Sequence, residues 1–445
     1  MHDPLKASAE GGRAATVIKA LNAWNKELCP ADRRAKFLRM AAAPFVFYRG
    51  SNHLFWADFA VDQRLDRFAD PDATQTWLLG DLHAYNFGSF DNAKGDLVYQ
   101  VNDFDETMVA DYQLDLWRMA ISLVLIARAN GDLAADRQAD VIDAFSQTYL
   151  DSLKALRKDL GKGWGELRRD STSGRLQRFL NSVATEYDRK GMLDRWAPGK
   201  GKQRRLNLAR QDDLQAVTPA ERKELEQALR AYRKTLREPL DFKLLDCAHR
   251  LGAGTGSLGT PRLYLLIHDR ADHCQRILDV KRQGHPTGYA FLDPAKQADF
   301  DARFPNPAQR HAKGCRALLR RTDPYLGWLS LSDGEYSVRE RSPFKEGFPG
   351  EVLDSRFPFA EQSEYWAQAL ATDHSRATKG FAKAVHIKLD KRDDEFRALV
   401  REIAFSYADQ VQADWDSFVA ALELGPCDVV DPGYEPPRYR DLLPR

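Results

Sequence analysis

The stretch LLGDLHAYNFG, residues 78–88, is followed closely by VYQVNDFDE, residues 98–106. Each stretch joins a short apolar run to a turn rich in polar side chains. Five polar residues of these turns stand out: Asp81, His83, Asn86, Asp103 and Asp105. Carboxylates gathered in this way repel one another unless a cation or a reacting proton compensates them. The two stretches therefore predict a cation site.

The apolar runs indicate where these turns lie in the fold. TWLLG at 76–80 and DLVYQV at 96–101 are short, apolar and bounded by Gly or Asp turn signals, which is typical of strands. The polar side chains are then expected at strand ends. DLWRMAISLVLIARA, which begins at Asp115, is apolar nearly all round. That pattern predicts a buried helix beneath the site.

A third set of motifs lies past the middle of the chain. GTGSLG, with Gly254, Gly256, Ser257 and Gly259, leads into the apolar run RLYLLI, and the later run ILDVK ends in Lys281. Phosphoryl transfer uses an Asp as base, an Asn and an Asp as Mg²⁺ ligands, and a glycine-rich loop with a lysine for the phosphates. Taken singly, Asp-rich turns, glycine triplets and lysines usually mark only caps, tight turns and solvated surface. Their combination favours a phosphoryl-transfer site.

GDLHAYN and NDFDE resemble the motifs HGDLHxxN and IDFE of the aminoglycoside and choline kinase-like phosphotransferases more than the HRDxxxxN and DFG of protein kinases. The resemblance implies a base, Asp81, with His83 and Asn86 beside it in the catalytic loop and His83 bracing that loop. It implies three metal ligands: Asn86, Asp103 and Asp105. It also implies a nucleotide-binding set: Gly254, Gly256, Ser257, Gly259, Lys281, Arg49 and Val338.

Two positions bear on how the catalytic loop is held. Leu79 stands where the related motif begins with histidine, so the usual support of the loop has no assigned residue. Asp115 resembles an aspartate that holds this loop in the related phosphotransferases. Arg49, in FYRG, either meets a phosphate or substrate anion or braces the loop through an ion pair.

Kinases place the glycine loop and lysine before the catalytic and metal aspartates, whereas this chain has the reverse order. A circular permutation reconciles the two orders. We therefore expect an α+β, bilobal protein kinase-like fold with a small mixed β lobe and a larger, mainly helical lobe. Because domain termini often lie close together, helices after Glu361 are expected to meet the N-terminal segment. The expected parts are 1–138 in the large lobe, a charged helical insert at 139–245, the small lobe at 246–345, and large-lobe helices at 346–445.

The whole layout is similar to a bacterial family of uncharacterised proteins, the domain of unknown function 2252 family, which is taken here as kinase-like. The motifs that carry the resemblance span most of residues 45–420, apart from the helical insert. They are FYRG, GDLHAYNFG, NDFDE, GTGSLGT, Val280 with Lys281, Gln309 with Arg310, YLGW at 325–328, YSVRE, and YADQ at 407–410. This family implies no particular substrate.

Active kinases pair the phosphate-binding lysine with a glutamate on a helix. The helix expected across AQRHAKGCRALLRR, residues 308–321, contains no acidic residue. Three interpretations stay open: Asp299 or Asp301, just upstream, substitutes as the partner of Lys281, Lys281 is positioned differently, or turnover is slow.

The composition of the chain limits the classes of partner that it is expected to bind. The 445 residues carry a net charge of +1, so no chain-wide field favours nucleic acid or membrane. MAISLVLIA at 119–127 falls well short of the roughly 20 residues of a membrane helix. The N-terminus has no apolar signal core, and the five scattered cysteines show no metal-binding spacing. We therefore expect reduced thiols and a cytoplasmic protein.

These features favour an ATP- and Mg²⁺-dependent phosphotransferase that acts on a hydroxyl group of a small molecule or a protein. Alternatives are AMP transfer from the same site, a nucleotide-binding regulator without catalysis, and a metal-dependent phosphodiesterase that uses His83 and the aspartates. The basic segment 189–210 also permits nucleic-acid contact, although a solvated loop is the favoured interpretation. The acceptor and the oligomeric state stay open.

Overall fold

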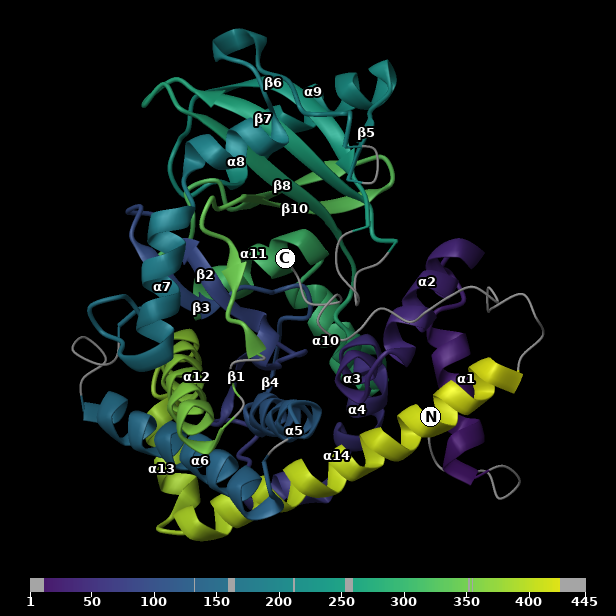
Figure 1. Cartoon of the computed structure of the whole chain (residues 1–445), viewed down its shortest axis with the longest axis vertical. Coiled ribbons are helices and arrows are strands. Elements are labelled where there is room, and N and C mark those ends of the chain that lie inside the picture. The colour runs from purple at the N-terminus through teal and green to yellow at the C-terminus, as the bar shows by residue number, and fades with distance from the viewer. Residues whose placement is uncertain are drawn as a thin grey trace.

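The computed structural model describes residues 12–131, 133–158, 165–210, 213–252, 259–350, 353 and 355–424. It has an α+β architecture. A six-stranded antiparallel sheet stands at the top of Figure 1, and helices with two smaller sheets lie below it. Among the described helices, none has the length and apolar character needed to cross a membrane.

The described part of the chain begins with four short helices on one side of the molecule (Figure 1). They are α1 (Gly12–Trp24), α2 (Pro30–Ala41), α3 (Pro44–Gly50) and α4 (Asn52–Phe59), followed by the turn η1 (Gln63–Arg67). Pro30 sits in the first turn of α2, where its missing N–H removes no helical hydrogen bond. Arg49 lies in the last turn of α3, so the FYRG motif is helical.

Two small antiparallel sheets follow, and both polar turns start from them. β1 (Gln75–Leu78) pairs with β4 (Met108–Asp111), whereas β2 (Phe87–Asp91) lies between β3 (Leu97–Val101) and β11 (Glu346–Gly347). The short turn η2 (Ala84–Asn86) precedes β2. The predicted strands at 76–80 and 96–101 are therefore confirmed as β1 and β3, and the polar side chains follow their ends.

The helical core surrounds α5 (Gln113–Ala129), whose residues are buried from Gln113 to Ala127, as the sequence predicted. Four further helices pack around it or around one another: α6 (Ala135–Lys158), α12 (Arg356–Ala377), α13 (Phe381–Leu389) and α14 (Asp393–Leu424). The apolar positions of α14 face this core, including Phe396, Ile403 and Phe418.

The six-stranded sheet has the order β5-β6-β7-β8-β10-β9. Its strands are β5 (Leu214–Ala216), β6 (Phe242–Arg250), β7 (Arg262–Asp269), β8 (Gln275–Gln283), β9 (Gly327–Leu331) and β10 (Gly334–Glu340). Side chains alternate between its faces. One face packs Leu265, Val280 and Val338 against α9 (Pro219–Tyr232), and the other packs Leu266 and Ile277 against α8 (Arg189–Trp196).

Residues 139–245 are shared between the two regions, which corrects the prediction of one helical insert. The helices α6 and α7 (Gly174–Glu186) pack on α12, while α8, β5 and α9 belong to the six-stranded sheet. Segment 189–210 is also more ordered than expected, because it contains α8 and the turn η3 (Gly201–Gln203), and Trp196 is buried against Tyr264. The segment is ordered because the apolar residues of α8 pack against the six-stranded sheet.

The remaining elements connect the sheet to the helices. They are η4 (Arg233–Thr235), η5 (Thr287–Phe291), α10 (Pro294–Arg303) and α11 (Pro307–Leu318). α11 packs on β8, β9 and β10 and also on β1 and α12. It therefore lies between the two regions, as Figure 1 shows.

The C-terminal helix α14 returns to the N-terminal helices, which confirms that expectation (Figure 1). Arg13 on α1 forms ion pairs with Asp414, at 2.8 Å, and with Asp58, at 2.7 Å. Trp415 donates a hydrogen bond to the carbonyl of Met40 at 3.2 Å. The two ends of the described chain are therefore joined in one helical region.

Asp373 on α12 provides a test of this core. It is 0% exposed, and neither carboxylate oxygen has a hydrogen-bond partner among the described residues. Burial raises its pKa to about 8, against the opposing charge of Arg376. The unfolded carboxyl, by contrast, titrates near about pH 4. The folded state thus holds the extra proton, and the associated stability is lost as pH rises towards the folded pKa.

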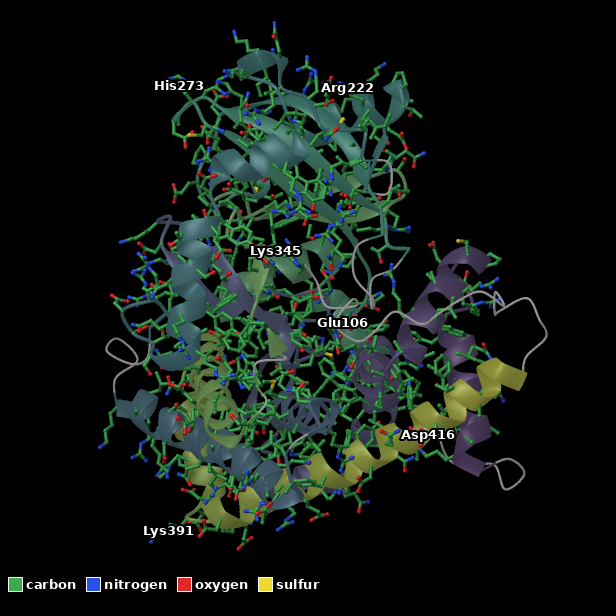
Figure 2. All side chains as sticks on the ribbon, viewed as in Figure 1. Glu106, Arg222, His273, Lys345, Lys391 and Asp416 are labelled. Atoms are coloured by element: carbon green, nitrogen blue, oxygen red, sulfur yellow. The ribbon has the colours of Figure 1, made fainter. Side chains whose placement is uncertain are left out.

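We predict that wild type loses stability relative to Asp373→Asn between about pH 4 and about pH 8, by up to about 1.4 kcal/mol per pH unit. Urea denaturation at several pH values measures this difference. Asp416→Asn, on the exposed surface of α14 (Figure 2), is the matched control. A constant difference between wild type and Asp373→Asn across this range would contradict the prediction.

Candidate active site

The two polar turns touch at Gly80. This residue has φ +76°, and a Cβ added to it would overlap the carbonyl oxygen of Glu106. The left-handed conformation and the close approach both require glycine. Gly80 therefore sets the spacing between the turn that follows β1 and the turn that follows β3.

Asp115 holds the loop before Asp81, which confirms its predicted role. Its carboxylate accepts hydrogen bonds from the backbone N–H groups of Leu79, at 2.8 Å, and Gly80, at 3.0 Å. His374 of α12 lies 3.4 Å from the same carboxylate, and its other ring nitrogen lies 2.9 Å from the Tyr149 hydroxyl. This buried network supplies the support that Leu79 lacks.

The carbonyl of Gly80 is held as well. It accepts hydrogen bonds from Asn52 Nδ2, at 3.1 Å, and Trp56 Nε1, at 2.9 Å. Both donors come from α4. The loop is therefore fixed from opposite sides by α4 and α5 before it reaches Asp81.

Asp81 is paired with Arg118, a fully buried guanidinium on α5. Arg118 Nε donates to Asp81 Oδ1 at 2.8 Å, and its Nη2 donates to the same oxygen. Among the described residues, none hydrogen-bonds Asp81 Oδ2. Burial raises the pKa of Asp81, against the opposing charge of Arg118. One oxygen is therefore anchored and the other stays available.

His83 and Asn86 lie one turn beyond Asp81. Arg49 Nε donates to His83 Nε2 at 3.2 Å, and burial, followed by the charge of Arg49, lowers the pKa of His83 well below its usual value. His83 is thus a neutral acceptor that holds Arg49. Asn86 is 4% exposed, and its Oδ1 has no partner among the described residues. A buried amide oxygen without a hydrogen-bond partner is a suitable ligand for a hard cation.

The second turn meets the sheet through Asp105. Lys281 of β8 forms an ion pair with Asp105 Oδ2, although the two residues are 176 positions apart. Gln283 donates to Asp105 Oδ1 at 2.9 Å. Burial raises the pKa of Asp105, but the charge of Lys281 helps to outweigh burial and lowers it below the usual value. Both oxygens of Asp105 are therefore engaged by the sheet.

The observed partner of Lys281 is Asp105, which differs from the partner that the sequence suggested. Asp301 accepts a hydrogen bond from the Tyr289 hydroxyl at 2.8 Å and lies near His285, and neither Asp299 nor Asp301 pairs with Lys281 in the described structure. Both acids lie on α10, whereas the acidic turn after β3 reaches the lysine directly.

Asp103, by contrast, is exposed and accepts only the backbone N–H of Asp105, at 3.4 Å, among the described residues. Behind the turn, Arg310 on α11 is fully buried and donates to the carbonyls of Asp105, at 2.6 Å, and Thr107. The turn is rigidly held while the Asp103 carboxylate is left without an ion pair in the described chain.

A cavity of about 240 Å³ brings most of the predicted residues together. Seven of them line it: Arg49, Asp81, His83, Asn86, Asp103, Asp105 and Lys281. Glu106 lies in the same wall, and Figure 2 shows it between the six-stranded sheet and the helices. The cavity therefore lies where the two regions meet.

The other predicted residues lie elsewhere. Gly254, Gly256 and Ser257 are outside the described residues. Gly259, with φ +80°, lines a second cavity of about 700 Å³, which shares Thr260 and Lys281 with the first. Val338 is 0% exposed in the cluster against α9, on the face of the sheet opposite Lys281, so it lines neither cavity.

The cavity and support residues that the sequence analysis missed include Lys36, Glu106 and Arg118. Arg118 could be identified from the sequence, because it is the single charged residue between Asp115 and Arg128 in an otherwise apolar stretch. Glu106 follows NDFD directly, and burial raises its pKa to about 7 against the hydrogen bond from Thr287. Lys36 could not be singled out from the sequence, because α2 carries several basic residues.

Within the described ranges, no three side chains of His, Cys, Asp or Glu form a group suited to a metal ion. Magnesium at a phosphoryl-transfer site needs no such group, because it commonly takes one or two protein oxygens and completes its shell with phosphates and water. Asn86 and Asp103 provide that smaller set.

The model of one protein family matches residues 28–421, and its description is "Uncharacterized protein conserved in bacteria" (DUF2252). The match includes every described residue of the cavity except Trp24. Comparisons with curated proteins and with solved structures returned no match.

The contact at Gly80 predicts that Gly80→Ala destabilises the chain by about 1–2 kcal/mol for the left-handed backbone and by about 1–3 kcal/mol more for the overlap with Glu106. Gly95→Ala is the matched control, because Gly95 has φ +77° and no atom within 4 Å of an added Cβ. Chemical denaturation measures both variants. Equal losses in the two would show that the turns do not need this contact.

Proposed function

The chain belongs to the DUF2252 family of uncharacterized bacterial proteins, and we propose that it is an ATP- and Mg²⁺-dependent phosphotransferase with a circularly permuted, kinase-like fold. The observation that carries this proposal is the shared cavity. It joins the acidic turns near the start of the chain to Lys281, which follows the glycine-rich segment, through the ion pair with Asp105.

The available oxygens fit a magnesium nucleotide. Asn86 Oδ1 is buried without a partner, and Asp103 is exposed without an ion pair in the described chain, so these two residues would hold the metal. Bound there, Mg²⁺ neutralises charge on the phosphate oxygens. Asp105 contributes less than the sequence implied, because Lys281 and Gln283 engage both of its oxygens.

The acceptor side centres on Asp81. Its Oδ1 is anchored by Arg118, so Oδ2 is the oxygen that accepts the proton of the acceptor hydroxyl. The acceptor oxygen forms a bond to the terminal phosphorus, the bond from that phosphorus to the oxygen of ADP breaks, and the hydroxyl proton passes to Asp81. The raised pKa of Asp81 favours this proton transfer.

The two cavities together provide room for a nucleotide. The smaller one, of about 240 Å³, suits phosphates and a small acceptor, whereas ligand sites for larger molecules usually reach about 300–1,000 Å³. The neighbouring cavity of about 700 Å³ begins at Thr260 and Lys281 and supplies the space for the nucleoside. Val338 lines neither cavity, so the proposed nucleotide site does not include it.

We predict that Asp103→Asn weakens Mg-ATP binding at least about tenfold, because the variant loses a charged metal ligand. Asp81→Asn keeps an oxygen for Arg118 and should bind Mg-ATP normally, while turnover falls by about 10²–10⁴. Calorimetry measures binding, and ADP formation with water or added hydroxyl compounds measures turnover. Asp241→Asn, whose side chain is 66% exposed, is the matched control.

Labelled ATP separates phosphoryl from AMP transfer, since the product keeps the γ-phosphate in one case and the α-phosphate in the other. Binding without any consumption would favour a nucleotide-binding regulator. Wild-type protein that binds no magnesium nucleotide would refute the proposed function.

A further inference from the structure

Helix α2 brings a cation to the cavity that the phosphoryl-transfer motifs do not include. Lys36 is 5% exposed, yet it lines the smaller cavity with Asp81 and Glu106. Asp32 lies four positions earlier, on the same face of the helix, and lines the larger cavity. A Cβ added to Gly259 would lie 3.1 Å from Asp32 Oδ2. α2 therefore runs along both cavities and reaches the end of the glycine-rich segment.

Lys36 has no hydrogen bond or ion pair with another described residue. The nearby carboxylates already have direct partners: Arg118 holds Asp81, and the backbone N–H of Thr287 donates to Glu106. They act on Lys36 only through their charge. A buried ammonium without a direct partner is unfavourable unless a ligand compensates it.

The other two predicted phosphate-binding cations of this cavity are already held by protein groups. Lys281 is paired with Asp105, and Arg49 donates to the neutral ring of His83. Burial lowers the pKa of Lys36 to about 8, while Glu106 and Asp81 limit the decrease. The side chain is therefore mostly charged at neutral pH, and its three donors are available to a ligand.

We propose that Lys36 is a binding residue for the terminal phosphoryl group of the nucleotide, and this inference rests on the proposed function. The attacked phosphorus lies about 3–3.5 Å from the acceptor oxygen, and that oxygen in turn hydrogen-bonds to the base, Asp81. A cation that lines the same cavity as Asp81, and that interacts with its charge, is therefore placed to meet the transferred group. The negative charge on the oxygens of that group is the partner that Lys36 lacks.

The test compares ATP with ADP, because only ATP has the terminal group. In Lys36→Met the apolar stem is kept and the charge is removed. We expect the variant to bind Mg-ATP about 10–100-fold more weakly than wild type, which corresponds to the loss of a charge-assisted hydrogen bond of about 1.5–3 kcal/mol. Mg-ADP affinity should change by less than about twofold. Calorimetry at neutral pH measures both constants.

Lys26→Met is the matched control, because the Lys26 side chain is 70% exposed and pairs only with Glu27 among the described residues. It should change neither constant. A parallel loss for ATP and ADP in Lys36→Met would indicate a structural role, and unchanged constants would indicate no role, so either result overturns the inference. Both of those results leave the proposed function intact, whereas wild-type protein that binds neither nucleotide overturns both proposals.

Discussion

Four carboxylates share one small cavity, and the repulsion between them is the constraint on which the arrangement of the site depends. Each is compensated differently: Asp81 by Arg118, Asp105 by Lys281, and Glu106 by a hydrogen bond from Thr287 and by partial protonation near neutral pH. Asp103, by contrast, has no ion pair among the described residues and accepts only the backbone N–H of Asp105, at 3.4 Å. Because the other three are satisfied by the protein, the remaining negative charge is concentrated at one position, where a divalent cation is the natural complement.

The same contacts join the two regions of the molecule. Lys281 and Gln283 extend from the six-stranded sheet to Asp105, and Arg310 on α11 holds the backbone of that turn from behind. Contacts of this kind explain why a cavity forms here: the sheet approaches the helical region through charged and hydrogen-bonded groups instead of a continuous apolar interface. A ligand between them would interact with both regions at once.

Local patterns in the sequence predicted what depends on neighbouring residues. The strands before both turns and the buried helix α5 follow from apolar spacing and turn signals. Long-range partners could not be predicted in this way. The pairing of Lys281 with Asp105 and the packing of α8 on the sheet depend on which faces meet in three dimensions. Val338 shows the same limit, because its motif YSVRE was recognised in the sequence, whereas the face of the sheet on which its side chain lies was not predicted.

The loop before Asp81 is supported without a histidine at position 79. With leucine at position 79, no histidine side chain is available to hold the turn, and Asp115 instead binds the backbone N–H groups of Leu79 and Gly80 while His374 stabilises its carboxylate. Leu79 can then be buried in the apolar core, at 1% exposed. The polar support of the loop comes from α5 and α12, and because backbone amides serve as donors, the geometry of Asp81 depends little on the side chain at position 79.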